Sequence, residues 1–302
     1  MRFLLLGANG QVGFELHRGL EALGEVIPAT RDGLLPGGGV ARVADLSDLA
    51  ALVALLDDIK PDVIVNAAAY TAVDRAESEP ELAHAINAAA PAALARWCAA
   101  RGGKLVHYST DYVFDGRSDR PWREDDATAP LGVYGRSKRD GETGIELSGC
   151  EHLILRTAWV YAARGHNFLR TMMRLAGERD HLRVVSDQIG SPTPARWIAA
   201  VTVALLARWQ AGAPWPAGIV HLTSSGQTSW HGFAEAIFSA AVDAGLLERA
   251  PQVEAILTSA YPTPAQRPAH SCLDTFALRT RFGVSLPDWR VGVSQTLAEL
   301  AR

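Results

Sequence analysis

The chain has 302 residues, 48% of them hydrophobic and 21% charged, which suits a globular protein with one large or two unequal domains. A formal net charge of −4 and the lack of a basic block argue against nucleic-acid binding through the phosphate backbone. No apolar run approaches the roughly 18 residues of a membrane span. The three cysteines lie far apart without C-x-x-C spacing, which is typical of a reducing compartment. We therefore expect a cytoplasmic protein.

Short apolar runs alternate with longer helical patterns in the first half of the chain. This order, with short links, predicts a parallel sheet covered by helices on both faces. We expect strands at residues 2–6, 25–29, 61–69, 104–110 and 152–161, and helices at residues 12–23, 45–59, 80–103 and 134–147. Ser47 is the candidate N-cap of the helix at 45–59.

The alternation loosens after about residue 165. Helical patterns continue at residues 193–212 and 229–246, separated by Pro-rich loops. We expect an α/β fold in which residues 1–165 form a Rossmann-type, doubly wound, dinucleotide-binding domain. Residues 166–302 are expected to form mainly a substrate-binding lobe, with some segments returning to the core.

Three glycines, Gly7, Gly10 and Gly13, lie between the first predicted strand and the first predicted helix. In that place a first glycine permits a tight turn, a second lets a pyrophosphate approach the backbone, and a third lets helix and strand pack closely. Free N–H groups of Gln11 and Val12 would face the anion. The alternative is a turn glycine with two packing glycines, but the position favours dinucleotide binding.

Residues after the second predicted strand should meet the adenosine ribose. Thr30 and Arg31 suit a 2′-phosphate, whereas Asp32 suits a free 2′-hydroxyl. Because Arg31 comes first, we favour NADPH, with NADH as the alternative. Asp45 and Leu46 are candidates for flanking the adenine, although Asp45 equally suits a helix N-cap.

The stretch "VYGRSK" places Tyr134 and Lys138 four residues apart, on one face of a predicted helix. A phenol that exchanges a proton near pH 7 needs its pKa lowered by about 3 units, or about 4 kcal/mol. One ammonium roughly 4 Å away supplies that much at an effective dielectric near 20. The alternative is a half-exposed tyrosine beside a solvated lysine, but the chain has only three lysines. Ser109 and Thr110, from the preceding strand, offer a hydroxyl for the reacting carbonyl.

Together with these residues, several segments resemble the dTDP-4-dehydrorhamnose reductase family of the extended short-chain dehydrogenase/reductase superfamily. They are, in chain order, "GANGQVG", "NAAAYTAVDRAESEPELA", "HYSTDYVFDG", "PLGVYGRSK", "RTAWVY", "DQIGSPT", "TSAYPTPAQRP" and "LPDWRVGV". The resemblance runs from residue 1 to about residue 293. The second and third segments are the most specific to this family, whereas the glycine turn and the Tyr–Lys pair occur throughout the superfamily.

The resemblance implies an NAD(P)H-dependent reduction of dTDP-4-dehydro-L-rhamnose to dTDP-L-rhamnose, with hydride delivered to C4 of the sugar. It implies that Tyr134 protonates the resulting oxyanion, that Lys138 lowers the tyrosine pKa and holds the ribose, and that Thr110 hydrogen-bonds the same oxygen. The implied cofactor positions are Gly10, Gln11, Val12, Asp45, Leu46, Ala69, Tyr70, Thr71, Tyr134 and Lys138, to which the residue patterns above add Gly7 and Arg31. The implied substrate positions are Val73, Thr110, Asp111 and Trp159. Without the resemblance, Trp159 would be interpreted as a core residue, because it follows a predicted strand.

Some positions depart from the family pattern. Tyr70 stands where some members have His. Glu15 and Glu299 match glutamates that link some members into a dimer through Mg²⁺, but Arg196 stands at another of those positions and would repel a metal. We therefore expect no metal site, and the oligomeric state stays open, a homodimer included. Arg267 suits either a contact with the nucleotide phosphates or a contact that ties down the smaller lobe.

Two other functions are compatible with the same residues. One is a related reductase or epimerase of another nucleotide-sugar. The other is a non-catalytic regulatory subunit, against which the presence of both Tyr134 and Lys138 argues.

Overall fold

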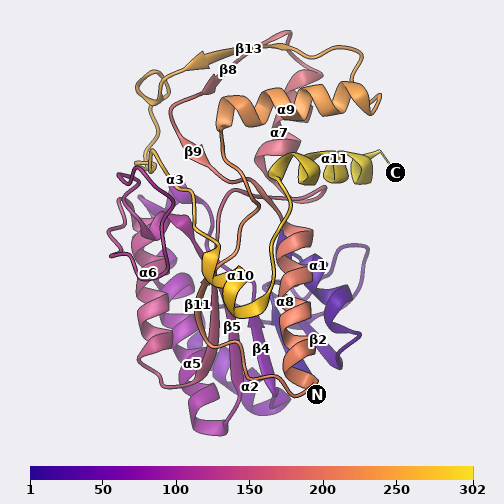
Figure 1. Cartoon of the computed structure of the whole chain (residues 1–302). Coiled ribbons are helices and arrows are strands. Elements are labelled where there is room, and N and C mark those ends of the chain that lie inside the picture. The colour runs from indigo at the N-terminus through magenta and orange to yellow at the C-terminus, as the bar shows by residue number, and fades with distance from the viewer. Residues whose placement is uncertain (302) are drawn as a thin grey trace.

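Short apolar runs form one seven-stranded parallel sheet in the computed structural model, which describes residues 1–301 (Figure 1). The strand order is β11-β6-β5-β4-β1-β2-β3, and every neighbouring pair is parallel. The strands are β1 (Arg2–Leu6), β2 (Glu25–Thr30), β3 (Arg42–Val43), β4 (Val63–Asn66), β5 (Lys104–Thr110), β6 (Glu151–Thr157) and β11 (Gly218–His221). The central strands are buried along almost their whole length, as expected for a sheet covered on both faces. The predicted fold class is confirmed.

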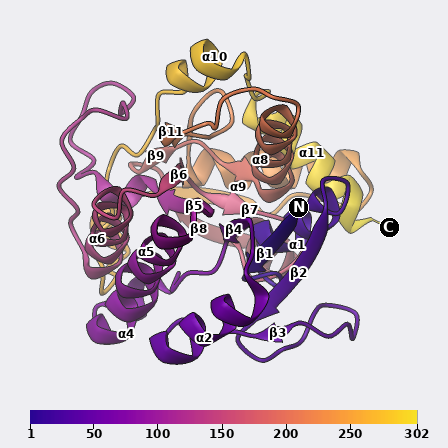
Figure 2. The same ribbon diagram turned by 90° about the horizontal axis from the view of Figure 1, so that it is seen from below.

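Helices cover the sheet on both sides, as the view from below shows (Figure 2). On one face, α1 (Gln11–Leu20) packs against α8 (Ala195–Gln210) through buried aliphatic side chains such as Leu16 and Ile198, and α10 (Phe276–Phe282) adds Leu278. On the other face lie α2 (Leu49–Ile59), α5 (Ala90–Arg101) and α6 (Val133–Glu146). The burial of these apolar faces, each side chain contributing about 1.5–3 kcal/mol, holds the layers together.

The helix expected at 45–59 begins later than its pattern suggested. The expected cap Ser47 donates its backbone N–H and its hydroxyl to Asp45 Oδ1 instead, at 2.8 and 2.7 Å. The N-cap is Asp48, whose side chain accepts a hydrogen bond from the Ala51 N–H. Asp45, Ser47 and Asp48 are all residue types that commonly cap helices, so local preference does not distinguish them.

The predicted helix at 80–103 contains a π-helical turn. It divides into α4 (Pro80–His84), the π turn η1 (Ala85–Ala89) and α5. Asn87, in the π turn, is fully buried and bonds the backbone of Tyr70 through both amide atoms, at 2.9 and 3.0 Å. A π turn inserts one extra residue into a helix, often at a functional site, and here it directs the amide into the loop after β4.

The predicted strand at 152–161 is interrupted. β6 ends at Thr157, and Trp159 has a φ of +48°, a left-handed conformation that is uncommon for a bulky residue. The chain resumes as β7 (Val160–Tyr161), which pairs with β10 (Thr193–Pro194) outside the main sheet. The predicted strand at 61–69 likewise ends early, at Asn66. Its last three residues form the start of a loop.

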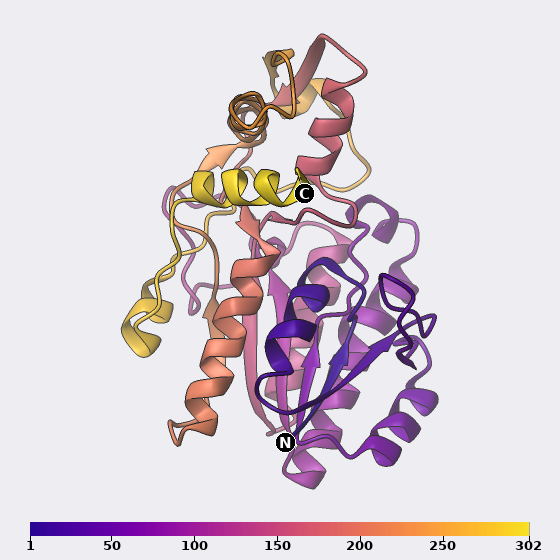
Figure 3. The same ribbon diagram turned by 90° about the vertical axis from the view of Figure 1, so that its right-hand side faces the viewer.

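An upper lobe lies beyond the carboxyl ends of the strands (Figures 1 and 3). Its core joins aromatic and aliphatic side chains such as Phe233, Phe238 and Trp289. The lobe elements are α7 (Phe168–Ala176), β8 (His181–Val185), β9 (Ile189–Gly190), β12 (Thr228–Ser229), α9 (Trp230–Asp243), β13 (Gln252–Ile256), η3 (Thr258–Ala260) and α11 (Trp289–Leu300). Among residues 1–301, no helix combines the length and apolarity needed to cross a bilayer.

Candidate active site

The glycine turn joins β1 to α1 and leaves no room for side chains. Gly7 has a φ of +76°, and a Cβ there would lie 2.7 Å from the backbone N of Ala68. A Cβ on Gly13 would lie only 2.0 Å from the carbonyl oxygen of Gly7. Gly10 is the N-cap and supplies no side chain, so the backbone N–H groups of Gln11 and Val12 begin α1 without partners within the helix. Such N–H groups at the positive end of a helix fit a pyrophosphate.

The end of β2 presents the residues expected near the adenosine ribose. Thr30 Oγ1 donates to Asp32 Oδ1 at 3.0 Å, and the Leu34 N–H donates to the same carboxylate. These bonds, the backbone one first, lower the pKa of Asp32. Arg31 is exposed, and within residues 1–301 it makes no ion pair shorter than 4.0 Å. The carboxylate is thus engaged and the guanidinium is free, which favours a 2′-phosphate.

Asp45 and Leu46 follow β3 at the same edge of the sheet. Leu46 is 5% exposed and packs in the core under α2. The bonds that Asp45 accepts from the Ser47 side chain and backbone lower its pKa. Asp45 therefore orders the turn before α2 and is not its N-cap.

The loop after β4 carries Ala69, Tyr70 and Thr71. Ala69 and Tyr70 are half-buried and Thr71 is exposed. The Tyr70 hydroxyl donates to Glu79 at 2.6 Å, which raises the tyrosine pKa. Asn87 holds the Tyr70 backbone and also donates to the Ser137 hydroxyl at 3.0 Å. The π turn thereby fixes this loop to α6, the helix that carries Tyr134.

Thr110 and Asp111 end β5 at the carboxyl edge of the sheet. Thr110 Oγ1 donates to Asp111 Oδ1 at 2.9 Å. Asp111 is 2% exposed, and burial raises its pKa to about 6 against the opposing hydrogen bond from Thr110. Three buried atoms here lack a partner, namely Asp111 Oδ2, Ser109 Oγ and Thr157 Oγ1. Because buried polar atoms are normally paired, these atoms suit a polar ligand.

Tyr134 lies in the first turn of α6, half-buried, with its ring edge-on to Tyr112 at 5.5 Å between centroids. Burial raises its pKa to about 12, although a hydrogen bond with the Thr110 side chain lowers it in part. The Lys138 ammonium does not contribute to lowering the Tyr134 pKa. The expected lowering of the Tyr134 pKa by Lys138 is therefore not found in this structure. Desolvation dominates because the phenol lies against Thr110 and Tyr112.

Lys138 is 2% exposed and directs its ammonium into the sheet. Nζ donates to the Tyr108 carbonyl oxygen at 2.6 Å and lies 3.1 Å from His107 Nε2. Burial lowers the Lys138 pKa to about 8, and the Glu142 carboxylate opposes this shift. Tyr134 and Lys138 do share one face of α6, as their spacing predicted, but the lysine is bonded to β5.

The upper lobe brings Trp159 and Arg267 to the edge above the sheet. Trp159 stacks on Trp230, with centroids 3.5 Å apart and planes inclined by 3°. A Cβ on Gly190 would lie 2.3 Å from the Trp159 ring, so the stack requires a glycine there. Trp230 and Arg267 also line a cavity of about 640 Å³ between α7, β8 and η3.

The short helix α3 (Val73–Ala76) begins at Val73 and is bonded to Arg267 through Asp74. Arg267 bonds both carboxylate oxygens of Asp74, at 2.9 and 2.8 Å. This bidentate pair connects a loop of the C-terminal part to α3, so of the two expectations for Arg267 the structure favours a tie between the lobe and the core. Val73 begins α3 and is half-buried.

Glu15 and Glu299 both contact arginines. Arg164 donates to Glu299 at 2.9 Å and lies 3.8 Å from Glu15, and Arg196 lies 3.7 Å from Glu299. Burial and the Glu299 charge raise the pKa of Glu15. The guanidinium groups of Arg164 and Arg196 thus lie beside the carboxylates of Glu15 and Glu299.

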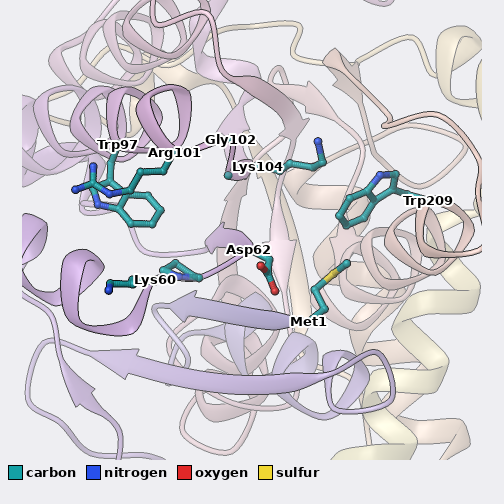
Figure 4. A pocket seen from close by; sticks show the side chains of 10 residues that line it. Met1, Lys60, Asp62, Trp97, Arg101, Gly102, Lys104 and Trp209 are labelled. Carbon is teal, nitrogen blue, oxygen red and sulfur yellow. The ribbon is translucent and has the colours of Figure 1, made fainter.

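A second cavity, of about 660 Å³, lies at the amino ends of the strands, opposite the glycine turn (Figure 4). Three of its charged groups, Lys104, Arg101 and Asp62, already have partners. Lys104 bonds Glu151, Arg101 bonds Asp57 at 2.7 Å, and Asp62 accepts from the Arg2 N–H at 2.7 Å. We therefore assign the chemistry to the carboxyl edge.

Sequence reasoning missed three polar residues of this site, Asn66, Asn87 and His107. Asn66 and His107 are fully buried neighbours in β4 and β5. Their only sequence signal is a polar residue within an otherwise apolar strand. The signal for Asn87 was weaker still, since an asparagine in a long helix pattern gives no hint of a π turn.

Comparisons with known proteins agree with this geometry. The family model described as RmlD substrate binding domain matches residues 1–302. A relative from Burkholderia thailandensis named dTDP-4-dehydrorhamnose reductase is 48% identical and is covered over 99% of each chain. The solved structure of a dTDP-4-dehydrorhamnose reductase from Clostridium acetobutylicum superposes with a TM-score of 0.89, at 33% identity over 100% of both chains. Another, from Bacillus anthracis and in complex with NADP, has a TM-score of 0.86 at 32% identity over 99% of both chains.

A match of this length and identity establishes the family. The chain therefore belongs to the RmlD substrate-binding-domain family and, within it, to the dTDP-4-dehydrorhamnose reductases.

Proposed function

We propose that this protein reduces the C4 keto group of dTDP-4-dehydro-L-rhamnose to give dTDP-L-rhamnose, with NADPH as the favoured cofactor and NADH as the alternative. The observation that carries the proposal is the meeting of three groups at one sheet edge: the glycine turn, the Thr110–Asp111 pair and Tyr134. The relatives named for this activity match the whole chain.

The bound nicotinamide supplies the hydride, and the protein supplies position and the proton. Tyr134 holds a proton at its hydroxyl, since its pKa of about 12 keeps the phenol neutral at physiological pH. Donating that proton to the reduced oxygen is the general-acid step. Thr110 lies beside Tyr134, and its hydroxyl, which donates to Asp111 Oδ1 in this structure, is proposed to turn to the same oxygen. Lys138 anchors α6 to β5 and is proposed to contact the ribose.

On the cofactor side, the N–H groups of Gln11 and Val12 are proposed to bind the pyrophosphate, and Arg31 the 2′-phosphate. Ala69, Tyr70 and Thr71, fixed by Asn87, are proposed to lie behind the nicotinamide ribose. Asp45 and Leu46 are proposed to flank the adenine.

We propose that the lobe built mainly from residues 166–302 receives the nucleotide-sugar. Its cavity is lined by the guanidinium groups of Arg179 and Arg183 and by the rings of Trp230 and Tyr261. Guanidinium groups suit a diphosphate and aromatic rings suit a base. Val73, Asp111 and Trp159 are proposed to contact the sugar between this cavity and the sheet.

The test follows the absorbance of reduced nicotinamide while purified protein acts on dTDP-4-dehydro-6-deoxy-L-mannose generated in situ. NADPH and NADH run in parallel, and the product is identified by mass. Stoichiometric loss of absorbance with dTDP-L-rhamnose formed supports the proposal. Product formed without net cofactor consumption identifies an epimerase instead. Tight NADPH binding without turnover removes this substrate and favours another keto-sugar or a regulatory subunit.

We also propose a cytoplasmic location, which the three buried and unpaired thiols support, since such thiols persist in a reducing compartment. A homodimer stays a prediction. Light scattering after size exclusion tests it directly, because the monomer has a mass of 32.3 kDa.

A further inference from the structure

A buried polar chain joins three neighbouring elements behind Tyr134. Asn66 on β4 bonds His107 on β5, with 3.1 Å between Nδ2 and Nδ1. His107 Nε2 then lies 3.1 Å from Lys138 Nζ on α6. All three side chains are at most 2% exposed. A chain of this kind has few alternative arrangements, because no solvent can replace a missing partner.

The backbone fixes the direction of the hydrogen bonds along this chain. The Ala68 N–H can only donate, and it faces the side-chain oxygen of Asn66 at 3.2 Å. The other amide atom, which faces His107, is therefore the nitrogen, and it donates to Nδ1. A neutral imidazole that accepts at Nδ1 carries its hydrogen at Nε2. Burial holds His107 neutral, since it moves the pKa of that residue well below 6.5, and the Lys138 charge adds to the shift.

This tautomer points an N–H at Lys138 Nζ. A neutral amine accepts that hydrogen through its lone pair while donating to the Tyr108 carbonyl oxygen. An ammonium has no lone pair, so in that form two N–H groups would face one another. We propose that His107, held by Asn66 as the Nε2–H tautomer, is a positioning residue that makes Lys138 a titrating group of the reductase and not a permanent cation.

The charges around Lys138 agree with this inference. Glu142, one turn further along α6, favours the ammonium. Its carboxylate is already neutralised by Arg156 of β6, through two bonds of 2.8 Å. Tyr134 stays neutral at physiological pH. Neither Glu142 nor Tyr134 therefore strongly opposes His107 and burial, which both favour the neutral amine. The Lys138 pKa of about 8 is consistent with this.

The effect of the Lys138 titration on turnover depends on the proposed function. Deprotonation removes one proton from Nζ and leaves its lone pair bonded to the His107 Nε2–H. The neutral amine keeps its lone pair on His107 and loses the positive charge and one N–H that the proposed contact with the ribose would use. Turnover should accordingly fall as pH rises through about 8.

The first experiment needs no activity. ¹⁵N spectra of the resting protein report the tautomer of His107, and labelled lysine reports the titration of Nζ, in a chain with only three lysines. We expect Nε2 protonated and Nδ1 bare at pH 7, and one Nζ titrating near pH 8. A proton on Nδ1, or a Lys138 Nζ that stays charged above pH 10, overturns the proposal.

The second experiment changes one atom of the chain. In Asn66→Asp the new carboxylate accepts from Nδ1–H, so the tautomer reverses and Nε2 accepts from the ammonium. We expect the Nζ titration and the alkaline limb of kcat to move up together by about one pH unit. His107→Gln, with its carbonyl oxygen turned to Nζ, should move both in the same direction if Asn66→Asp does not fold.

The matched control is His221→Gln, which alters another fully buried histidine that bonds the Trp122 carbonyl oxygen and does not contact Lys138. It should leave the Nζ midpoint in place whatever it does to the melting temperature. An unchanged midpoint in both test variants overturns the proposal. Wild-type protein that shows the expected spectra but no reductase turnover refutes the proposed function and leaves the tautomer standing.

Discussion

Replacing Gly13 by alanine tests whether the glycine turn is built for an anion. The new Cβ would lie 2.0 Å from the Gly7 carbonyl oxygen, 2.8 Å from its carbonyl carbon and 3.0 Å from the Ala8 Cα. All three are backbone atoms, so no side chain can turn away. Since real contacts of this kind are rarely shorter than 3.0 Å, the start of α1 must move by at least about 1 Å. Such overpacking costs about 1–3 kcal/mol of folding stability.

The displacement also carries the Gln11 and Val12 N–H groups away from the anion. A misplacement of about 1 Å can cost a factor of about 100 at a well-formed site, so we expect NADPH binding to weaken at least tenfold. Isothermal titration measures the Kd, and thermal unfolding measures the stability. Gly19→Ala is the matched control on the same helix, because its Cβ would meet the Val203 side chain, with Cγ2 at 2.7 Å, and no backbone atom of the glycine turn. Equal NADPH affinity in Gly13→Ala and wild type would refute the reasoning.

Three further predictions test single side chains. Tyr134→Phe should lower kcat by about 10²–10⁴ and leave the NADPH Kd within about twofold; retention of most activity in a stopped-flow assay would exclude Tyr134 as the acid. Arg31→Ala should weaken NADPH about tenfold and NADH hardly at all, and equal losses in parallel titrations would remove the phosphate contact. Asp111→Asn should raise the melting temperature at pH 7.5 while impairing turnover. The folded pKa of Asp111, about 6, lies above its ordinary value of 3.8; folding therefore favours the protonated acid, and stability is lost as pH rises from about 4 to 6. The gain, roughly 2–3 kcal/mol, should vanish near pH 4, and a gain that persists there would contradict the assigned cause.

Local patterns determined much of this protein. The order of strands and helices follows from hydrophobic periodicity, because each apolar run must be buried whatever it packs against. The Gly7 turn and the shared helix face of Tyr134 and Lys138 depend on residues within a few positions of one another. For that reason the fold class could be predicted, and a site at the carboxyl edge of the sheet could be proposed.

Only the tertiary structure decided how these groups are connected. Arg267 and Asp74 pair across 193 positions, and Trp159, at the break between β6 and β7, stacks on Trp230 of α9. The spacing of Tyr134 and Lys138 predicted a lysine that lowers the tyrosine pKa, whereas the structure bonds Lys138 to His107, a residue on a neighbouring strand. A pKa depends on burial and on such distant partners, so the electrostatics of the site could not be read from spacing alone.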